Sequence, residues 1–308
     1  MFFHHRPFSC VARGSGRGTL YFCIELMRLL KMAVAVLVCK HAVFGQLLVL
    51  PEKQQDPFSA EGHRYVSLLN THQHPNADSR IDVTYYRLNL HITTSPNFLR
   101  GVVTLKAISK VDQLATLSLD LTNTLTVDSI KMENVNVQFV QHPTTVSIEL
   151  NRSYGFGQMV VLDVYYQGIP QGTGFGSFVF GGHGSTPWVW TLSQPYGSRD
   201  WWPSKDHPID KADSVDIHVT CRQDFKVASN GKLVSITQNP DNTHTYFWST
   251  RYPIATYLVF VSLTNYAEFT DWYRYSPTDS MPVLNYVLPQ HLTQARDSLS
   301  KVLPPEPS

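Results

Sequence analysis

One short stretch of the chain, QPYGSRDWWPSKDHP, concentrates side chains that could do chemistry. The guanidinium of Arg199 is a planar donor that suits a carboxylate, so we expect a two-pronged ion pair with Asp200 or Asp206. Of the adjacent Trp201 and Trp202, we expect one ring to pack inward and the other to be exposed. The alternative is a loop that is only held together by its own ion pairs and aromatic contacts.

Histidines are the other candidates for chemistry, because imidazole is a common zinc ligand. His72, His74, His207 and His218 could be proposed as ligands. Single histidines, or histidines two apart, are more often solvated or structural. No histidine in the chain is followed by glutamate, so the zinc motif HExxH is absent. We expect no metal site in this chain, no cofactor, and no hydrolysis of aminoacyl substrates by this chain alone.

The elements that must position these groups are strands, because apolar and polar residues alternate with period two from residue 80 onward. The dipeptide Asn230-Gly231 suits a tight hairpin turn, and helical spacing begins only after Pro289. We therefore expect an all-β, antiparallel sandwich or open sheet with a short C-terminal helix. The predicted strands are 86–92, 117–121, 146–150, 159–166, 188–192, 215–219, 245–249 and 257–263.

The composition is that of a globular protein, with 308 residues of which 43% are hydrophobic. The 25 Lys and Arg against 24 Asp and Glu give a net charge of +1. No overall field would therefore attract nucleic acid or an anionic membrane, and we expect neither as a partner.

The first 45 residues differ from the rest and are expected to be a leader. A basic region, a short apolar run and small residues follow one another from Met27 to Gly45, as in a signal peptide, although Lys40 after the run is unusual. The run is too short to span a bilayer, and a buried strand or helix is the alternative interpretation. Residues 46–79 would be an N-terminal extension. The glycosylation sequon at Asn151 agrees with a secreted protein.

Three of the four cysteines lie in the leader, which leaves Cys221 alone in the mature chain, so no disulfide framework is expected.

The loop also carries a family resemblance. Its spacing matches (Glu/Gln)-Pro-x-x-x-Arg-x-x-x-Pro-x-x-Asp-x-Pro, a motif of the N-terminal domain of zinc metallo-aminopeptidases of the aminopeptidase N and leukotriene hydrolase type. Further blocks of the family follow in order, so the chain resembles this domain over about residues 80 to 290. Ser204 departs from the cysteine usual at that position, and Gln194 from the usual glutamate. The motif residues are Gln194, Pro195, Arg199, Pro203, Asp206 and Pro208.

The resemblance implies a saddle-shaped antiparallel β domain over residues 80–288, followed by the beginning of a catalytic-domain helix over 289–308. In the family, the residue matching Gln194 helps to hold the free α-amino group of a peptide substrate. Zinc is expected only in a full-length member that has the catalytic domain. A Gln194 that merely closes the loop by bonding backbone is the structural alternative. The functional alternative is a stand-alone, secreted, non-catalytic module for binding or regulation.

Overall fold

The structure is a computed structural model that describes residues 77–173 and 176–299. These residues all belong to one compact unit, Gln55–Ser308. The predicted leader, most of the predicted extension, His72 and His74 lie outside the described residues.

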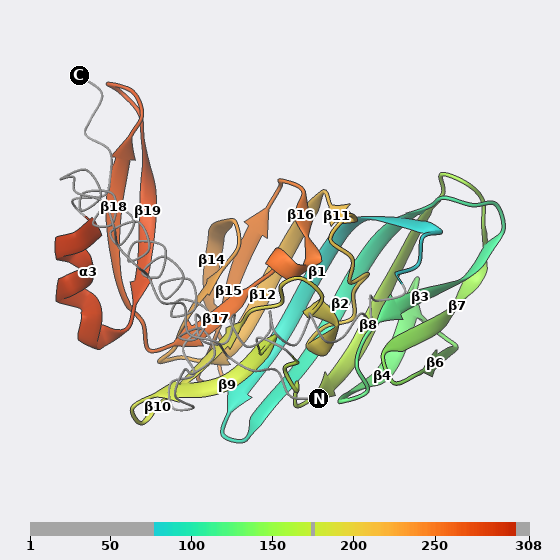
Figure 1. Ribbon diagram of the computed structural model, residues 1–308, viewed down its shortest axis with the longest axis horizontal. Coiled ribbons are helices and arrows are strands. Elements are labelled where there is room, and N and C mark those ends of the chain that lie inside the picture. The colour runs from blue at the N-terminus through green and yellow to red at the C-terminus, as the bar shows by residue number, and fades with distance from the viewer. Residues whose placement is uncertain (1–76, 174–175, 300–308) are drawn as a thin grey trace, which may run out of the picture. The chain divides into compact units, whose positions relative to one another are not determined.

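An eight-stranded sheet is the largest element (Figure 1). Its strand order is β14-β15-β12-β1-β2-β8-β4-β5, and every neighbouring pair is antiparallel except β1 with β12, which is parallel. The predicted all-β class is confirmed. The strands are β1 (Ile81–Thr94), β2 (Asn97–Ser109), β4 (Leu125–Met132), β5 (Val135–Val137), β8 (Met159–Gly168), β12 (Ser214–Arg222), β14 (Lys232–Gln238) and β15 (Thr243–Thr250).

Smaller antiparallel sheets lie beside the large one. A four-stranded sheet has the order β13-β17-β10-β9, a three-stranded sheet the order β3-β7-β6, and β11 pairs with β16. These strands are β3 (Leu114–Asp120), β6 (Phe139–Gln141), β7 (Thr145–Tyr154), β9 (Phe178–His183), β10 (Thr186–Thr191), β11 (Lys211–Ala212), β13 (Lys226–Ser229), β16 (Ile254–Ala255) and β17 (Val261–Thr264).

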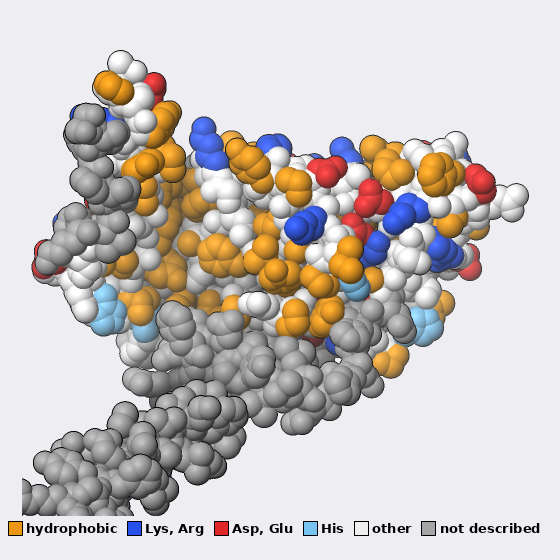
Figure 2. Space-filling view, turned by 45° about the horizontal axis from the view of Figure 1, so that its top comes forward, with side chains coloured by type: hydrophobic (Ala, Val, Ile, Leu, Met, Phe, Trp, Pro, Cys, Tyr) orange, Lys and Arg blue, Asp and Glu red, His pale blue; other side chains and the backbone are white. Residues whose placement is uncertain are grey.

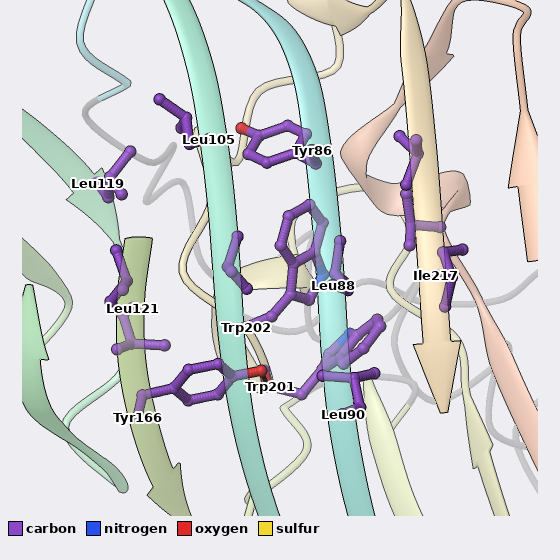
Figure 3. Close-up of a cluster of buried hydrophobic side chains, with 14 of the residues drawn as sticks. Tyr86, Leu88, Leu90, Leu105, Leu119, Leu121, Tyr166, Trp201, Trp202 and Ile217 are labelled. Carbon is purple, nitrogen blue, oxygen red and sulfur yellow. Dashed lines mark hydrogen bonds between the residues drawn. The ribbon is translucent and has the colours of Figure 1, made fainter. Parts of the chain in front are cut away.

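One hydrophobic core lies against the inner face of the large sheet. Along β1, Tyr86, Leu88, Leu90 and Ile92 are buried, as the period-two pattern predicts. Arg87 and His91, which lie between buried residues, are exposed. Strands of the smaller sheets add apolar side chains to the same core (Figure 3). The core is continuous across the sheets, so the loop that crosses it is held from several sides.

Two local predictions are corrected by the structure. Gly231 does adopt the positive φ of a tight turn, at +84°, but the turn joins β13 to β14, which belong to different sheets and do not form a hairpin. The predicted strand 257–263 is divided, because Thr256–Leu258 forms a 3-10 turn before β17 begins. The side chain of Asn230 fixes this region by accepting a hydrogen bond from the Phe260 N–H, at 2.7 Å.

The described chain ends in a hairpin, β18 (Ala267–Arg274) and β19 (Ser280–Val287), followed by a 3-10 turn (Pro289–His291) and the helix α3 (Leu292–Leu299). The predicted C-terminal helix is therefore found. Trp272 is 63% exposed and Leu284 38% exposed on the hairpin, and Figure 2 shows hydrophobic side chains over it at the upper left. Tyr286 anchors the hairpin by packing its ring on Trp248 of β15, with ring centroids 6.3 Å apart.

Candidate functional site

The tryptophan-containing loop connects β10 to β11 and crosses the core. Both Trp201 and Trp202 are completely buried, so the prediction that one ring would be exposed is wrong. The ring of Trp202 meets the ring of Tyr86 edge-on, with centroids 4.8 Å apart (Figure 3). The ring of Trp201 packs against the ring of Phe178, with centroids 5.8 Å apart. Each ring has an aromatic partner on a different sheet, which explains why both are drawn inward.

Hydrogen bonds fix the backbone around these rings. The indole N–H of Trp201 donates to the Ser193 hydroxyl at 2.9 Å, and the Trp201 carbonyl accepts from the Tyr166 hydroxyl of β8 at 3.0 Å. Tyr166 is itself buried, so this bond lies in a region of low dielectric where an unmade bond is costly. The loop is thereby tied to the large sheet.

Asp206 is the polar centre of the loop. Its carboxylate accepts a hydrogen bond from the Ser198 hydroxyl at 2.6 Å, and its N–H donates to the Asp120 carboxylate of β3 at 2.8 Å. The Ser204 hydroxyl lies 2.8 Å from the Ser198 hydroxyl, so serine satisfies the position where the family usually has cysteine. Burial raises the pKa of Asp206 to about 7 and that of Asp120 to about 6.

The predicted ion pair of Arg199 with Asp200 or Asp206 is wrong. Asp200 accepts instead from the hydroxyls of Thr173, at 2.6 Å, and of Ser177. Arg199 gives Asp206 only a backbone N–H, at 3.5 Å, and its charge lowers the pKa of Asp206 against the larger effect of burial. Within residues 77–173 and 176–299, the buried Nε of Arg199 has no hydrogen-bond partner. Hydroxyl groups of serine and threonine therefore make the hydrogen bonds to Asp200 and Asp206 that Arg199 was expected to make.

Gln194 is exposed, unlike the residues of the loop from Gly197 to Asp206, which are buried or half-buried. It follows β10 directly and is joined to Pro195 by a cis peptide bond. No described residue makes a hydrogen bond to its side chain. Pro203 is buried and Pro208 half-buried, so the prolines of the motif belong to the anchored part.

Sequence reasoning missed a buried ion pair at the end of the loop. Lys205 pairs with Asp210, and its ammonium also donates to the Ile81 carbonyl of β1 at 2.6 Å. Nothing in the local sequence indicates that this lysine is buried, since lysine is rarely buried unless it is paired.

No group of three His, Cys, Asp or Glu side chains that could hold a metal is found in the described part of the chain. His207 contacts the ring of Tyr196, and His218 stacks on Phe247 with centroids 4.2 Å apart. The described histidines therefore do not fit a zinc ion. Cys221 is a free, buried thiol.

Asn151 of the predicted sequon lies exposed on β7, and its side-chain oxygen accepts from the Tyr154 hydroxyl at 2.9 Å. None of the described helices is long and apolar enough to cross a membrane.

Comparison with solved structures finds the same fold in M1 zinc metallopeptidases. One mutant of the enzyme from Deinococcus radiodurans is 24% identical with a TM-score of 0.60, and the match covers 69% of this chain and 49% of that one. The unmutated enzyme is 23% identical with a TM-score of 0.59, covering 68% and 48%. A complex of the mutant with a Tyr-Ser-Ala substrate is 22% identical with a TM-score of 0.60, covering 71% and 53%.

This chain thus spans about half the length of these structures. No curated protein matches it in a sequence comparison. Residues 83–258, which contain the whole loop and most of the strands, match the family described as the peptidase M1 N-terminal domain. The chain belongs to the peptidase M1 N-terminal domain family.

Proposed function

We propose that this chain is the N-terminal β domain of a zinc metallo-aminopeptidase, and that Gln194 helps to bind the free α-amino group of the peptide substrate. The observation that carries the proposal is the contrast within the loop. Gln194 is exposed and makes no side-chain hydrogen bond to a described residue, whereas Trp201, Trp202 and Asp206 behind it are completely buried. The packed residues of the loop fix the backbone at Gln194, while its side chain remains available to a ligand. A ligand-binding side chain needs such a fixed position.

The chemistry of the amide suits this role. A protonated α-amino group has only donors, and the side-chain carbonyl of Gln194 is an acceptor. A hydrogen bond to a charged group contributes about 1.5–3 kcal/mol, so one such contact affects affinity measurably. The zinc and the general base would come from a separate catalytic domain, because the described residues offer neither.

The hairpin β18–β19 supports the docking of such a domain. One of its faces carries Trp272, Pro282 and Leu284, all exposed. Residues paired across an antiparallel hairpin share a face, and Trp272 pairs with Pro282. Exposed apolar faces of this kind mark contact surfaces in proteins.

We also propose that the protein is exported. This proposal rests on the sequence from Met27 to Gly45, which lies outside the described residues, and on the exposed sequon at Asn151. N-terminal sequencing of protein secreted by cultured cells tests it, and a start after Gly45 is expected.

The kinetic test compares Gln194→Ala and Gln194→Glu in a polypeptide that carries this domain together with the zinc-binding domain. Gln194→Ala should lower kcat/KM for peptides with a free amino terminus by roughly ten- to a hundredfold. Gln194→Glu should retain or raise it, because a carboxylate adds an opposite charge at the same reach. The exposed Gln223, in the turn after β12, provides a matched control as Gln223→Ala. Unchanged kcat/KM in Gln194→Ala would refute the proposal.

A further inference from the structure

A shallow cavity of about 280 Å³ lies on the outer, solvent-facing side of the eight-stranded sheet, away from the core. The pairing of the strands sets out its lining in two adjacent rows. In one row, His91 of β1 lies between Arg100 of β2 and Thr220 of β12. In the next row, Asn89 of β1 is paired with His218 of β12. With Thr245 of β15, two pairs of strands that are more than 100 residues apart in sequence, β1 with β2 and β12 with β15, thus place polar side chains around one depression.

The lining is rich in hydrogen-bond donors. It includes one arginine, which is always charged, and two histidines, and none of the described residues that line it is acidic. Burial lowers the pKa of His218, so this imidazole contributes as a neutral N–H donor. Arg100 donates from Nε and Nη2 to the same oxygen of Gln167, at 3.3 and 3.2 Å. A guanidinium has five N–H donors, so these two long bonds to a single acceptor leave donors for a ligand.

The two threonine hydroxyls of the cavity and the imidazole of His218 are held in place. Thr220 and Thr245 share a hydrogen bond of 2.8 Å, and Thr245 also accepts from Asn239 at 3.0 Å. The ring of His218 lies flat on Phe247, with an interplanar angle of 9°. A lining whose rotamers are fixed in this way loses little entropy when a ligand binds.

The acidic groups near the cavity have their own partners. Asp216 lies on β12, two residues before His218. Its carboxylate accepts from Arg251 at 2.7 Å and from the Tyr85 hydroxyl at 2.8 Å. Asp128 accepts from Gln167 at 2.9 Å, and Asp241 accepts from the Thr243 hydroxyl. Their engagement reduces their competition for Arg100.

We propose that this cavity binds a sulfate or phosphate group. The planar donors of arginine match the oxygens of such a group, and the amide of Asn89, the hydroxyl of Thr220 and the imidazoles supply further donors. The volume of about 280 Å³ lies just below the roughly 300–1,000 Å³ of pockets for drug-sized ligands, so the cavity has room for one such group. The group could be a free ion or an ester on a larger molecule such as a sulfated sugar. This site is separate from Gln194 and does not depend on peptidase function.

The test follows the imidazole C–H signals of His91 and His218 by NMR in the full chain, assigned with His91→Gln and His218→Gln. Sodium sulfate replaces sodium chloride at constant ionic strength, and inorganic phosphate is titrated in the same way. Both signals should shift to saturation with a dissociation constant on the order of a few millimolar. Arg100→Gln should weaken binding roughly tenfold or more, because a charged hydrogen bond is lost. The exposed Arg152 of β7 supplies the control Arg152→Gln, which should bind like the unchanged chain.

A second arm identifies the source of the group by comparing a sulfated disaccharide with its unsulfated form. Sulfated disaccharide that binds at least tenfold more tightly than inorganic sulfate indicates an ester on a sugar, and equal affinity indicates a free ion. If Arg100→Gln disturbs the fold, Thr220→Val replaces it, with an expected weakening of about threefold. The proposal is wrong if neither anion shifts the two signals, if the unsulfated disaccharide binds equally well, or if Arg152→Gln weakens binding as much as Arg100→Gln.

Discussion

Replacing Gly101 with alanine should destabilise the whole domain, because Tyr166 occupies the space that a side chain would need. Gly101 of β2 and Tyr166 of β8 are paired in register. A Cβ atom at Gly101 would lie 2.5 Å from Cε1 and 2.7 Å from Cζ of the tyrosine ring. The ring is completely buried and its hydroxyl is bonded to the Trp201 carbonyl, so it cannot swing away without breaking the contact that holds the loop.

The magnitude follows from three contributions. Overpacking costs about 1–3 kcal/mol, and an unsatisfied buried carbonyl at Trp201 costs about 1–3 kcal/mol. Alanine recovers about 0.5–1 kcal/mol, because glycine is the poorer residue within a strand. We therefore expect Gly101→Ala to lower the free energy of unfolding by about 2–4 kcal/mol.

Urea denaturation followed by tryptophan fluorescence measures this change as a lower midpoint at unchanged slope. Gly155→Ala is the matched control, because the nearest atoms to a Cβ there lie 3.8 and 3.9 Å away, and it should change stability by less than about 0.5 kcal/mol. In a Tyr166→Leu background, Gly101→Ala should cost less than about 1 kcal/mol, since the ring is gone. The reasoning is refuted if Gly101→Ala is as mild as the control, or if its cost is unchanged in the Tyr166→Leu background.

Three further predictions concern other parts of the chain. Burial raises the pKa values of Asp120 and Asp206 to about 6 and about 7, so the folded chain binds these protons more tightly than the unfolded chain. The resulting stabilisation is complete below about pH 4 and is lost as the pH rises to 7, so Tm should fall over this range. Asp206→Asn should make this fall in Tm smaller. Curves of Tm against pH that run parallel for the variant and the unchanged chain would contradict the prediction. Protein secreted from mammalian cells should lose mass on enzymatic deglycosylation, and Asn151→Gln should abolish this loss; a secreted but unmodified chain contradicts the sequon. Amides of Leu292–Leu299 should exchange at least a hundredfold faster than those of β17, because this eight-residue helix is largely exposed, and equal protection in a monomer would contradict it.

The strands were the most predictable part of the fold. Tyr86 to Ile92 alternates because one face of β1 packs on the core, and the same reason applies to β7 and β12. The pairing partners were not predictable in this way. Alternation of apolar and polar residues predicts which face of a strand is buried, but it does not predict which strand pairs with it. The parallel pairing of β1 with β12, and the passage of the chain from one sheet to another at Gly231, are therefore seen only in the structure.

The site was predictable in its spacing but not in its contacts. The motif located the loop and its exposed Gln194, whereas the partners of Arg199 were predicted from charge alone. In the structure, Ser198 and two other hydroxyl-bearing side chains satisfy the carboxylates, and short uncharged donors have no signature in a sequence. The buried Lys205 was missed for another reason, because its partner carbonyl at Ile81 lies on a strand that is distant in sequence.

The parallel pairing of β1 with β12 also bears on how the chain is made. Tyr85 leaves the ribosome long before its partner Ser214, and at roughly 5–20 residues per second the interval is on the order of ten seconds. During that time β1 has β2 on one side and an open edge on the other. Open strand edges are templates for pairing with other chains. The exposed Arg87 and His91 make β1 more polar while its edge is unpaired. A chaperone that binds nascent strands could bind β1 during this interval.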